Sequence, residues 1–141
     1  MRVVLDTNVL ISGLISAGGP PSLIVDLWTE GKVQIVVSAA LLTEYFGVFL
    51  RPKFTAAGPP RSRQEILERL IGLPNTLVVV PEDRVTCIID DPDDDQFLEC
   101  AIAGVADCIV SGDEHLLGLG VFRGISIVSP REFIEMVNRG R

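Results

Sequence analysis

Short apolar runs alternate with longer stretches of helical periodicity along the whole chain, and this alternation restricts the folds available to it. The runs suit strands buried on both faces and lie at residues 3–5, 33–37, 76–80, 108–111 and 125–128. Helices are predicted at residues 8–17, 20–31, 41–51, 62–72, 95–105, 114–119 and 130–138, and a loop at residues 52–60. Alternating strands and helices indicate a central parallel sheet with helices on both faces. We therefore expect one α/β domain over residues 1–141.

The composition narrows the class of protein. Apolar residues make up 48% of the 141 positions and charged residues 22%, which is typical of a soluble globular protein. No apolar stretch approaches the ~20 residues that span a bilayer, so no membrane partner is expected. The first residues lack the features of a signal peptide, and Cys87, Cys100 and Cys108 show no CxxC spacing. We expect a cytoplasmic protein with reduced thiols, two of them in the core.

The formal net charge of −7 argues against a generic nucleic-acid binder, which usually carries a basic face. The charge is unevenly spread, however. Residues 90–95, DDPDDD, hold five of the nineteen acids, and such an acidic cluster either stays solvated or binds cations. A basic middle section contains Arg51, Lys53, Arg61, Arg63 and Arg69.

Two aspartates directly follow predicted strands. Asp6 interrupts the run VVLDTNVLIS, and Asp113 ends the run CIVSGD. Functional groups of open parallel α/β sheets gather beyond the carboxyl ends of the strands, so both residues fall at that edge. Taken singly, each is also consistent with an N-cap for the helix that follows.

Glu44 is predicted on the inner face of its helix, for which Ser38 is a plausible N-cap. Leu41 lies three positions before Glu44 and Val48 four positions after it, so the carboxylate shares a face with apolar residues. A carboxylate held against a core needs a cation or hydrogen-bond donors. The alternative is a glutamate at the border of the core that pairs with a neighbouring arginine.

The acidic run at residues 90–95 opens another predicted helix. The apolar face of that helix, projected backward, passes closest to Asp94 and has Asp95 at its margin. Periodicity is a poor guide within a first turn, so both residues remain candidates. Most acidic runs of this kind are solvated, and aspartates at a helix start also favour the helix dipole.

These carboxylates are predicted to meet at one edge of the sheet. Several carboxylates in one pocket repel one another unless cations lie between them. Oxygen-only ligation selects hard divalent ions such as Mg²⁺ or Mn²⁺. The residues alone therefore indicate a metal-dependent site for phosphoryl transfer or hydrolysis.

Other catalytic patterns are missing from the sequence, which contains no GxxxxGK[ST], GxGxxG or GxSxG motif. His115 is the only histidine, which disfavours zinc sites and Ser-His-Asp chemistry. It lies beside Glu114 at a helix start and is interpreted as a surface or capping residue.

Three blocks of sequence resemble the PIN-domain family, and more narrowly its branch of toxin components of prokaryotic toxin–antitoxin systems. The blocks are VVLDTNVLIS, SAALLTEYFGVFLRPKF and DDPDDDQFLECAIAGVADCIVSGDEHLL. The resemblance covers nearly the whole chain in order. It implies a three-layer α/β/α PIN-like fold and a ribonuclease specific for single-stranded RNA that depends on Mg²⁺ or Mn²⁺.

The resemblance also assigns roles to residues. The acidic quartet of the family corresponds to Asp6, Glu44, Asp95 and Asp113, where Asp95 is chosen by its separation of 18 residues from Asp113. Additional or substitute ligands in the acidic run are Asp94 and Asp91. Positions that support the acidic pocket by hydrogen bonding in the family are Asn8 and Ser111.

Binding partners follow from the same interpretation. Arg51 and Lys53, at the end of the Glu44 helix, are candidates for holding phosphates of the RNA, or else a solvated helix end. An antitoxin protein is an expected partner, and a homodimer is expected because family members commonly form one. Trp28, Phe46 and Phe49 provide either its interface or core packing. Two alternatives remain: an RNA-processing nuclease without an antitoxin, and a PIN-like binding module without catalysis.

Overall fold

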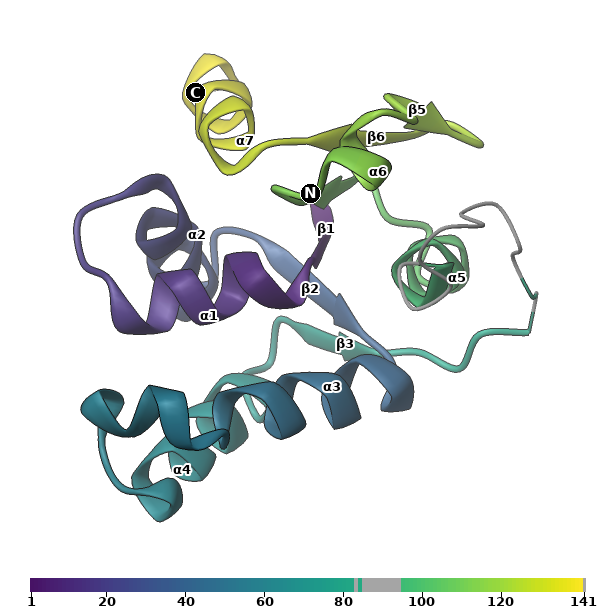
Figure 1. Cartoon of the computed structure of the whole chain (residues 1–141). Helices are drawn as coiled ribbons and strands as arrows, with labels where there is room; N and C mark the ends of the chain where they lie inside the picture. Colours follow the sequence, from purple (N-terminus) through teal and green to yellow (C-terminus); the bar gives the residue numbers. More distant parts are fainter. Residues whose placement is uncertain (83, 85–94, 141) are drawn as a thin grey trace.

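The computed structural model describes residues 1–82, 84 and 95–140 and contains one mostly parallel, six-stranded sheet of order β3-β2-β1-β4-β6-β5 (Figure 1). Its strands are β1 (Arg2–Leu5), β2 (Gln34–Val37), β3 (Thr76–Val78), β4 (Cys108–Val110), β5 (Val121–Phe122) and β6 (Ile125–Val128). All neighbours pair in parallel except β5, which pairs antiparallel with β6. The predicted parallel sheet is confirmed. The sequence did not reveal β5, because two residues are too few to show alternation.

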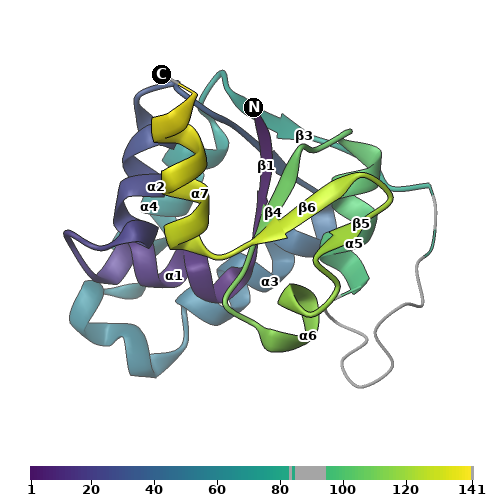
Figure 2. The same cartoon turned by 90° about the horizontal axis from the view of Figure 1, so that it is seen from above.

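Helices cover both faces of this sheet. They are α1 (Thr7–Ile15), α2 (Pro20–Thr29), α3 (Ala39–Phe49), α4 (Pro60–Ile71), α5 (Asp95–Ala103), α6 (Glu114–Leu117) and α7 (Pro130–Arg139). Figures 1 and 2 show α1, α2 and α7 together on one side of the sheet and α5 on the other. Since α3 contacts both α1 and α5, it lies across the edge where the two layers meet.

Most element boundaries agree with the sequence within a few residues. Ser38 is the N-cap of α3, as predicted, and its side chain accepts a hydrogen bond of 3.3 Å from the amide of Leu41. The expected loop at residues 52–60 is wrong in part, because Pro52–Ala57 forms the 3₁₀ helix η1. Proline at the first position fits a helix start, since its missing N–H has no partner there anyway.

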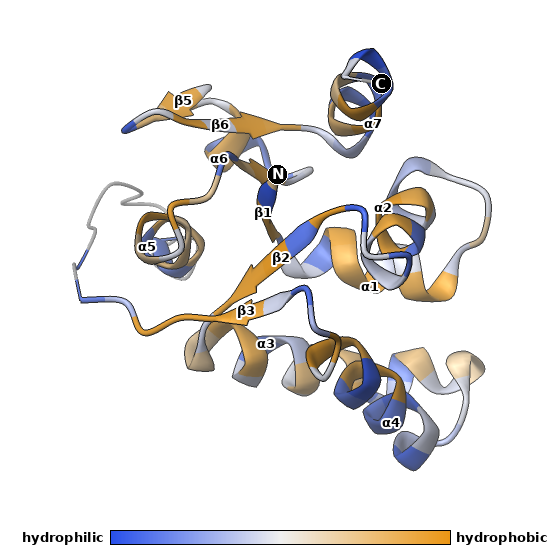
Figure 3. Cartoon of the chain, turned by 180° about the vertical axis from the view of Figure 1, so that it is seen from behind, coloured by the Kyte–Doolittle hydropathy of each residue, from blue (hydrophilic) through white to orange (hydrophobic). Residues whose placement is uncertain are grey.

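The core lies between the sheet and its helices, and strands β2, β3 and β6 are mostly hydrophobic in Figure 3. Cys100 and Cys108 are buried free thiols, and burial raises the pKa of both to about 12. The prediction of two core thiols is therefore confirmed, while Cys87 lies outside the described residues. Among the described helices, none alone is long and apolar enough to cross a membrane; α1 and α2 pass that test only as a pair bent by 88°.

Helices α1 and α2 approach each other closely at Gly13. A Cβ atom at this position would lie 2.6 Å from the backbone oxygen of Pro21 and 2.7 Å from Cγ2 of Val25. Because backbone cannot rotate away as a side chain can, Gly13→Ala should lower the free energy of unfolding by about 1–3 kcal/mol despite the higher helix propensity of alanine. Urea denaturation measures this loss.

Gly47 provides the matched control within α3. A Cβ atom there would meet no heavy atom within 4 Å. Gly47→Ala should therefore raise the free energy of unfolding by about 0.5–1 kcal/mol through helix propensity alone. Equal effects of the two substitutions would contradict the close approach of α1 and α2.

Candidate metal-binding site

Strands β1 and β4 end side by side, and each leads into a candidate residue. The two strands pair in parallel with Leu5 opposite Val110, so Asp6 and Ser111 begin at the same level of the sheet. The backbone amide of Asp6 continues the pairing by donating to the oxygen of Val110 at 2.9 Å. The shared sheet edge predicted for Asp6 and Asp113 is therefore present in the fold.

Asp6 is a buried carboxylate, with 5% of its surface exposed. It occupies the N-cap position of α1, yet its side chain makes no capping hydrogen bond there. The hydroxyl of Ser111, itself fully buried, donates instead to Oδ2 of Asp6 at 2.6 Å. The Asp6 side chain thus forms no capping hydrogen bond to α1, although the backbone amide of Asn8 lies close enough to lower its pKa.

The environment of Asp6 raises the pKa of its carboxyl group above the ordinary value of 3.8. Burial is the main cause, and the negative charges of Asp113 and Glu44 add to it. The hydrogen bond from Ser111 and the backbone amide of Asn8 act in the opposite direction without cancelling it. Carboxylates from three elements are thus close enough to repel one another.

Glu44 is half-buried on α3, and both of its carboxylate oxygens are hydrogen-bonded. The hydroxyl of Thr7 donates to Oε2, and the side-chain amide of Gln96 donates to Oε1 at 3.0 Å. In the described part of the chain Glu44 forms no ion pair, so the alternative of a neighbouring arginine is not supported. Three helices therefore meet at this one carboxylate.

Asp113 has two roles in its local structure. As N-cap of α6 it accepts hydrogen bonds from the amides of His115 at 2.7 Å and Leu116 at 3.3 Å, so the capping interpretation holds for it. Its own amide donates to the Ser111 hydroxyl at 2.9 Å. That oxygen consequently connects Asp113 to Asp6. His115 is exposed, as predicted, with Nδ1 3.6 Å from Oδ1 of Asp113.

Asp95 is the first residue of α5 and is buried, with 7% of its surface exposed. Its neighbour Gln96 contacts Glu44, which brings the start of α5 to the same sheet edge. Asp91 and Asp94 lie outside the described residues. The choice among these aspartates as a ligand stays a prediction.

The other polar residues singled out from the sequence differ in their exposure and contacts. The side chain of Asn8 is exposed and makes no hydrogen bond to the described residues, so its contribution there is its backbone amide. Arg51 and Lys53 are exposed beyond α3, with Lys53 Nζ 5.1 Å from the ring centre of Phe54. Arg63 does not belong to a basic surface, because only 1% of it is exposed.

Sequence patterns missed two contributors to the site, Thr7 and Gln96. Thr7 stands within the DTN triplet, where its position next to Asp6 was a usable signal. Gln96 gave no signal, because its partner is 52 positions away and no periodicity links them.

The side-chain oxygens at this edge of the sheet are of the type that binds a hard divalent cation. They are carboxylate and hydroxyl oxygens around a buried Asp6 that has no cationic partner among the described residues. No three Asp, Glu, His or Cys side chains of residues 1–82, 84 and 95–140 are already arranged around a common ion position.

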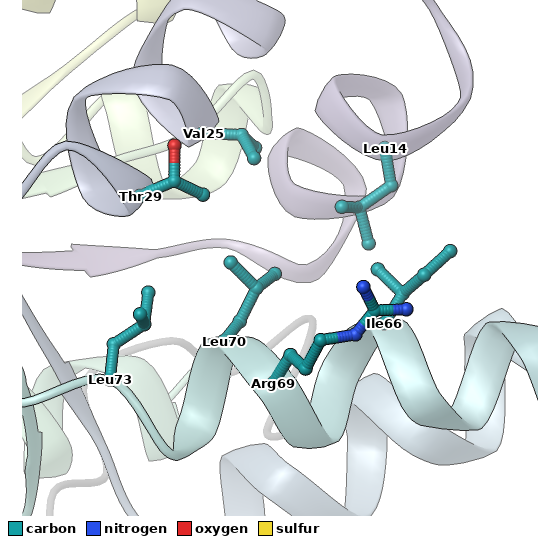
Figure 4. A pocket seen from close by; sticks show the side chains of 7 residues that line it. All are labelled: Leu14, Val25, Thr29, Ile66, Arg69, Leu70 and Leu73. Atoms are coloured by element: carbon teal, nitrogen blue, oxygen red, sulfur yellow. The ribbon is translucent and has the colours of Figure 1, made fainter.

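A concavity lies away from these carboxylates, between α1 and α2 on one side and α4 on the other (Figure 4). It has a volume of about 320 Å³ and is lined by Leu14, Val25, Thr29, Ile66, Arg69, Leu70 and Leu73. Apolar side chains dominate its wall and it offers no carboxylate, so it lacks the chemistry of the metal-binding candidate.

Comparison with known proteins identifies the family. The sequence model of the PIN domain matches residues 2–115, which include Asp6, Glu44, Asp95 and Asp113. The chain belongs to the PIN-domain family. PIN domains are typically nucleases and generally use divalent metals, which agrees with an oxygen-only site at the edge of the sheet.

Two relatives extend this comparison. The uncharacterized protein MJ1680 of Methanocaldococcus jannaschii is 31% identical over 143 residues, covering 96% of this PIN domain chain and 90% of that protein. The crystal structure of VapBC2 from Rickettsia felis bound to a DNA fragment from their promoter contains a chain of the same fold, with a TM-score of 0.58. That match covers 90% of this chain and 97% of the other at 15% identity, so it shows the fold alone.

Proposed function

We propose that this PIN domain is a metal-dependent endoribonuclease that hydrolyses phosphodiester bonds of single-stranded RNA. The observation that carries the proposal is the buried Asp6, whose pKa is raised by burial and by the charges of Asp113 and Glu44. Neighbouring buried carboxylates repel one another, and a divalent cation bound between them would offset that repulsion.

Mg²⁺ or Mn²⁺ is the proposed cofactor, held by Asp6, Glu44, Asp95 and Asp113, with Asp94 and Asp91 as further candidate ligands. Such an ion supplies charge neutralisation and an activated water when bound. Ser111 orients the carboxylate of Asp6, and the α6 amides hold that of Asp113. These contacts fix oxygens before the substrate arrives, so less freedom is lost in reaching the reactive arrangement.

The RNA backbone is proposed to run along α1 toward Arg51 and Lys53. Lys53 and the C-terminal end of α1, at Leu14 and Ile15, line one surface depression. The nine residues of α1 separate this depression from Asp6 by about 13 Å at 1.5 Å per residue. Both basic side chains are exposed and free of ion pairs with the described residues, which leaves them available to phosphates.

We further propose that the enzyme is the toxin of a toxin–antitoxin pair and acts in the cytoplasm. Support comes from the sequence blocks shared with that branch of the family and from the fold shared with a chain of the VapBC2 complex. Coexpression with the protein encoded next to it tests the pairing. A stable complex that suppresses cleavage is expected, and the absence of any such neighbour would favour the RNA-processing alternative.

A homodimer is also proposed, with an interface that does not include Trp28 or Phe49. Trp28 and Phe49 are 1% and 0% exposed and pack in the core, so they cannot form an interface; Phe46 is half-buried. Light scattering after size-exclusion chromatography distinguishes a dimer from the 15.3 kDa monomer.

Removal of divalent metal is expected to abolish cleavage. Labelled single-stranded RNA should be cut in the presence of Mg²⁺ or Mn²⁺, and excess EDTA should reduce the rate to background, since several kcal/mol of charge stabilisation is lost. Replenishing Mn²⁺ should restore the rate. Cleavage that survives EDTA would overturn the proposed chemistry, and metal binding without cleavage of varied RNAs would favour the noncatalytic binding module.

A further inference from the structure

Glu44 is held by side-chain donors from two other helices. Thr7 is the first residue of α1 and is buried, while Gln96 is the second residue of α5 and is half-buried. Each contributes one donor, and each takes a different oxygen of Glu44. An ionised carboxylate has only acceptor positions, so the NH₂ group of Gln96 and not its carbonyl faces Glu44.

We propose that Gln96 is a positioning residue that, together with Thr7, fixes the Glu44 carboxylate for binding of a divalent cation. This inference rests on the proposed function. A glutamate side chain has three rotatable bonds, and a cation that binds a freely rotating carboxylate must first order it. Donors from α1 and α5 restrict that rotation in the metal-free protein.

The hydrogen bond between Gln96 and Glu44 also affects the position of Asp95. Gln96 follows Asp95 directly, so the hydrogen bond to Glu44 also sets the distance between the start of α5 and α3. One contact thereby places two proposed ligands, although Gln96 itself touches neither the cation nor the substrate. Partners of this kind commonly change metal affinity by 10–100-fold when removed.

Calorimetric titration of the full chain with Mn²⁺ tests the proposal without any need for catalysis. Gln96→Leu keeps a similar volume but removes the donor, and we expect it to raise the Kd for Mn²⁺ at least about tenfold. Gln64→Leu is the matched control, because Gln64 donates to Glu68 at 2.9 Å on the exposed face of α4. It removes the same type of hydrogen bond far from the site and should leave the Kd unchanged.

A purely structural role makes a different prediction. If Gln96 only fastens α5 to α3, Gln96→Leu lowers the melting temperature of the metal-free protein, and the folded variant binds Mn²⁺ with the wild-type Kd. That result would overturn the proposal. Gln96→Met, an unbranched alternative with good helix propensity, serves the same test if Gln96→Leu does not fold.

Failure of the positioning role and failure of the proposed function give different results. Wild-type protein that binds no Mn²⁺ would reject the metal-dependent function itself, and this inference with it. Wild-type binding that is lost in Asp6→Asn but unchanged in both Gln96 variants would reject only the positioning role. Binding weakened in the Gln96 variants but not in Gln64→Leu supports it.

Discussion

Asp6→Asn is expected to reduce cleavage of single-stranded RNA by about 10²–10³-fold or more while leaving the fold intact. Loss of a ligand from the centre of the site removes several kcal/mol of charge stabilisation, and each 1.36 kcal/mol corresponds to a factor of ten in rate. The side-chain oxygen of asparagine can still accept the hydrogen bond from Ser111, so the end of β1 keeps its contact with β4. Single-turnover cleavage with labelled RNA measures the loss.

The same substitution should stabilise the protein in EDTA at neutral pH. Because the pKa of Asp6 is higher in the folded state than 3.8, the neutral form is favoured by folding, and that stabilisation is lost as the pH rises through the folded-state pKa. Asp6→Asn removes the penalty of ionisation, so its advantage in EDTA should shrink as the pH falls toward 3.8. Thermal denaturation across this range measures the trend.

Bound Mn²⁺ should reverse this order, so that the wild-type protein becomes more stable than Asp6→Asn. At a concentration of 100 times its Kd, Mn²⁺ should stabilise the wild-type protein by about 2.7 kcal/mol, and Asp6→Asn should show little of this gain. Asp26→Asn, at an exposed acid on α2, is the control and should behave as wild type. A variant at position 6 that is cleavage-competent and responds fully to Mn²⁺ would refute the assignment of Asp6.

Arg63→Met is expected to lower the free energy of unfolding by about 3–5 kcal/mol. Arg63 is 1% exposed, and its guanidinium donates to the backbone oxygens of Phe49 at 2.6 Å, Arg51 at 3.0 Å and Gly58 at 2.9 Å. The oxygen of Phe49 ends α3, where a positive charge is favoured by the helix dipole. Methionine fills a similar space but leaves these buried acceptors without their donor.

One further variant separates geometry from charge at position 63, and another provides an exposed control. Arg63→Lys keeps the cation but not the planar fork, so it should recover only part of the loss, to about 1–3 kcal/mol. Arg61→Met removes a solvent-exposed arginine that lies 3.5 Å from Glu65, and should change stability by no more than about 0.5 kcal/mol. An Arg63→Met protein as stable as Arg61→Met in urea would contradict the structural role.

Sequence alone was sufficient to predict residues whose position follows from a local rule. Asp6 and Asp113 follow apolar strands, and parallel topology then brings the carboxyl ends of those strands to one edge. Ser38 was recognised as an N-cap for the same reason, since the rule concerns only its own helix.

Residues whose role depends on a distant partner were not predictable in this way. Gln96 faces Glu44 only because α5 crosses the sheet on the opposite side from α1. The burial of Arg63 was not predictable either, since arginine is mostly exposed in proteins and nothing local to α4 indicates the carbonyl oxygens at the end of α3. The 3₁₀ helix η1 was not predicted, because Pro52 and the Gly58-Pro59-Pro60 segment that follows η1 are equally typical of a loop.

The hydroxyl of Ser111 has a single proton, and that proton is committed to Asp6, while the amide of Asp113 occupies the oxygen from the other side. The proton of Thr7 is committed to Glu44 in the same way. Neither hydroxyl therefore has a proton left to offer a phosphate. Within the described part of the chain, these two hydroxyls therefore present only acceptor oxygens at this edge, which agrees with the proposed need for a cation from solution.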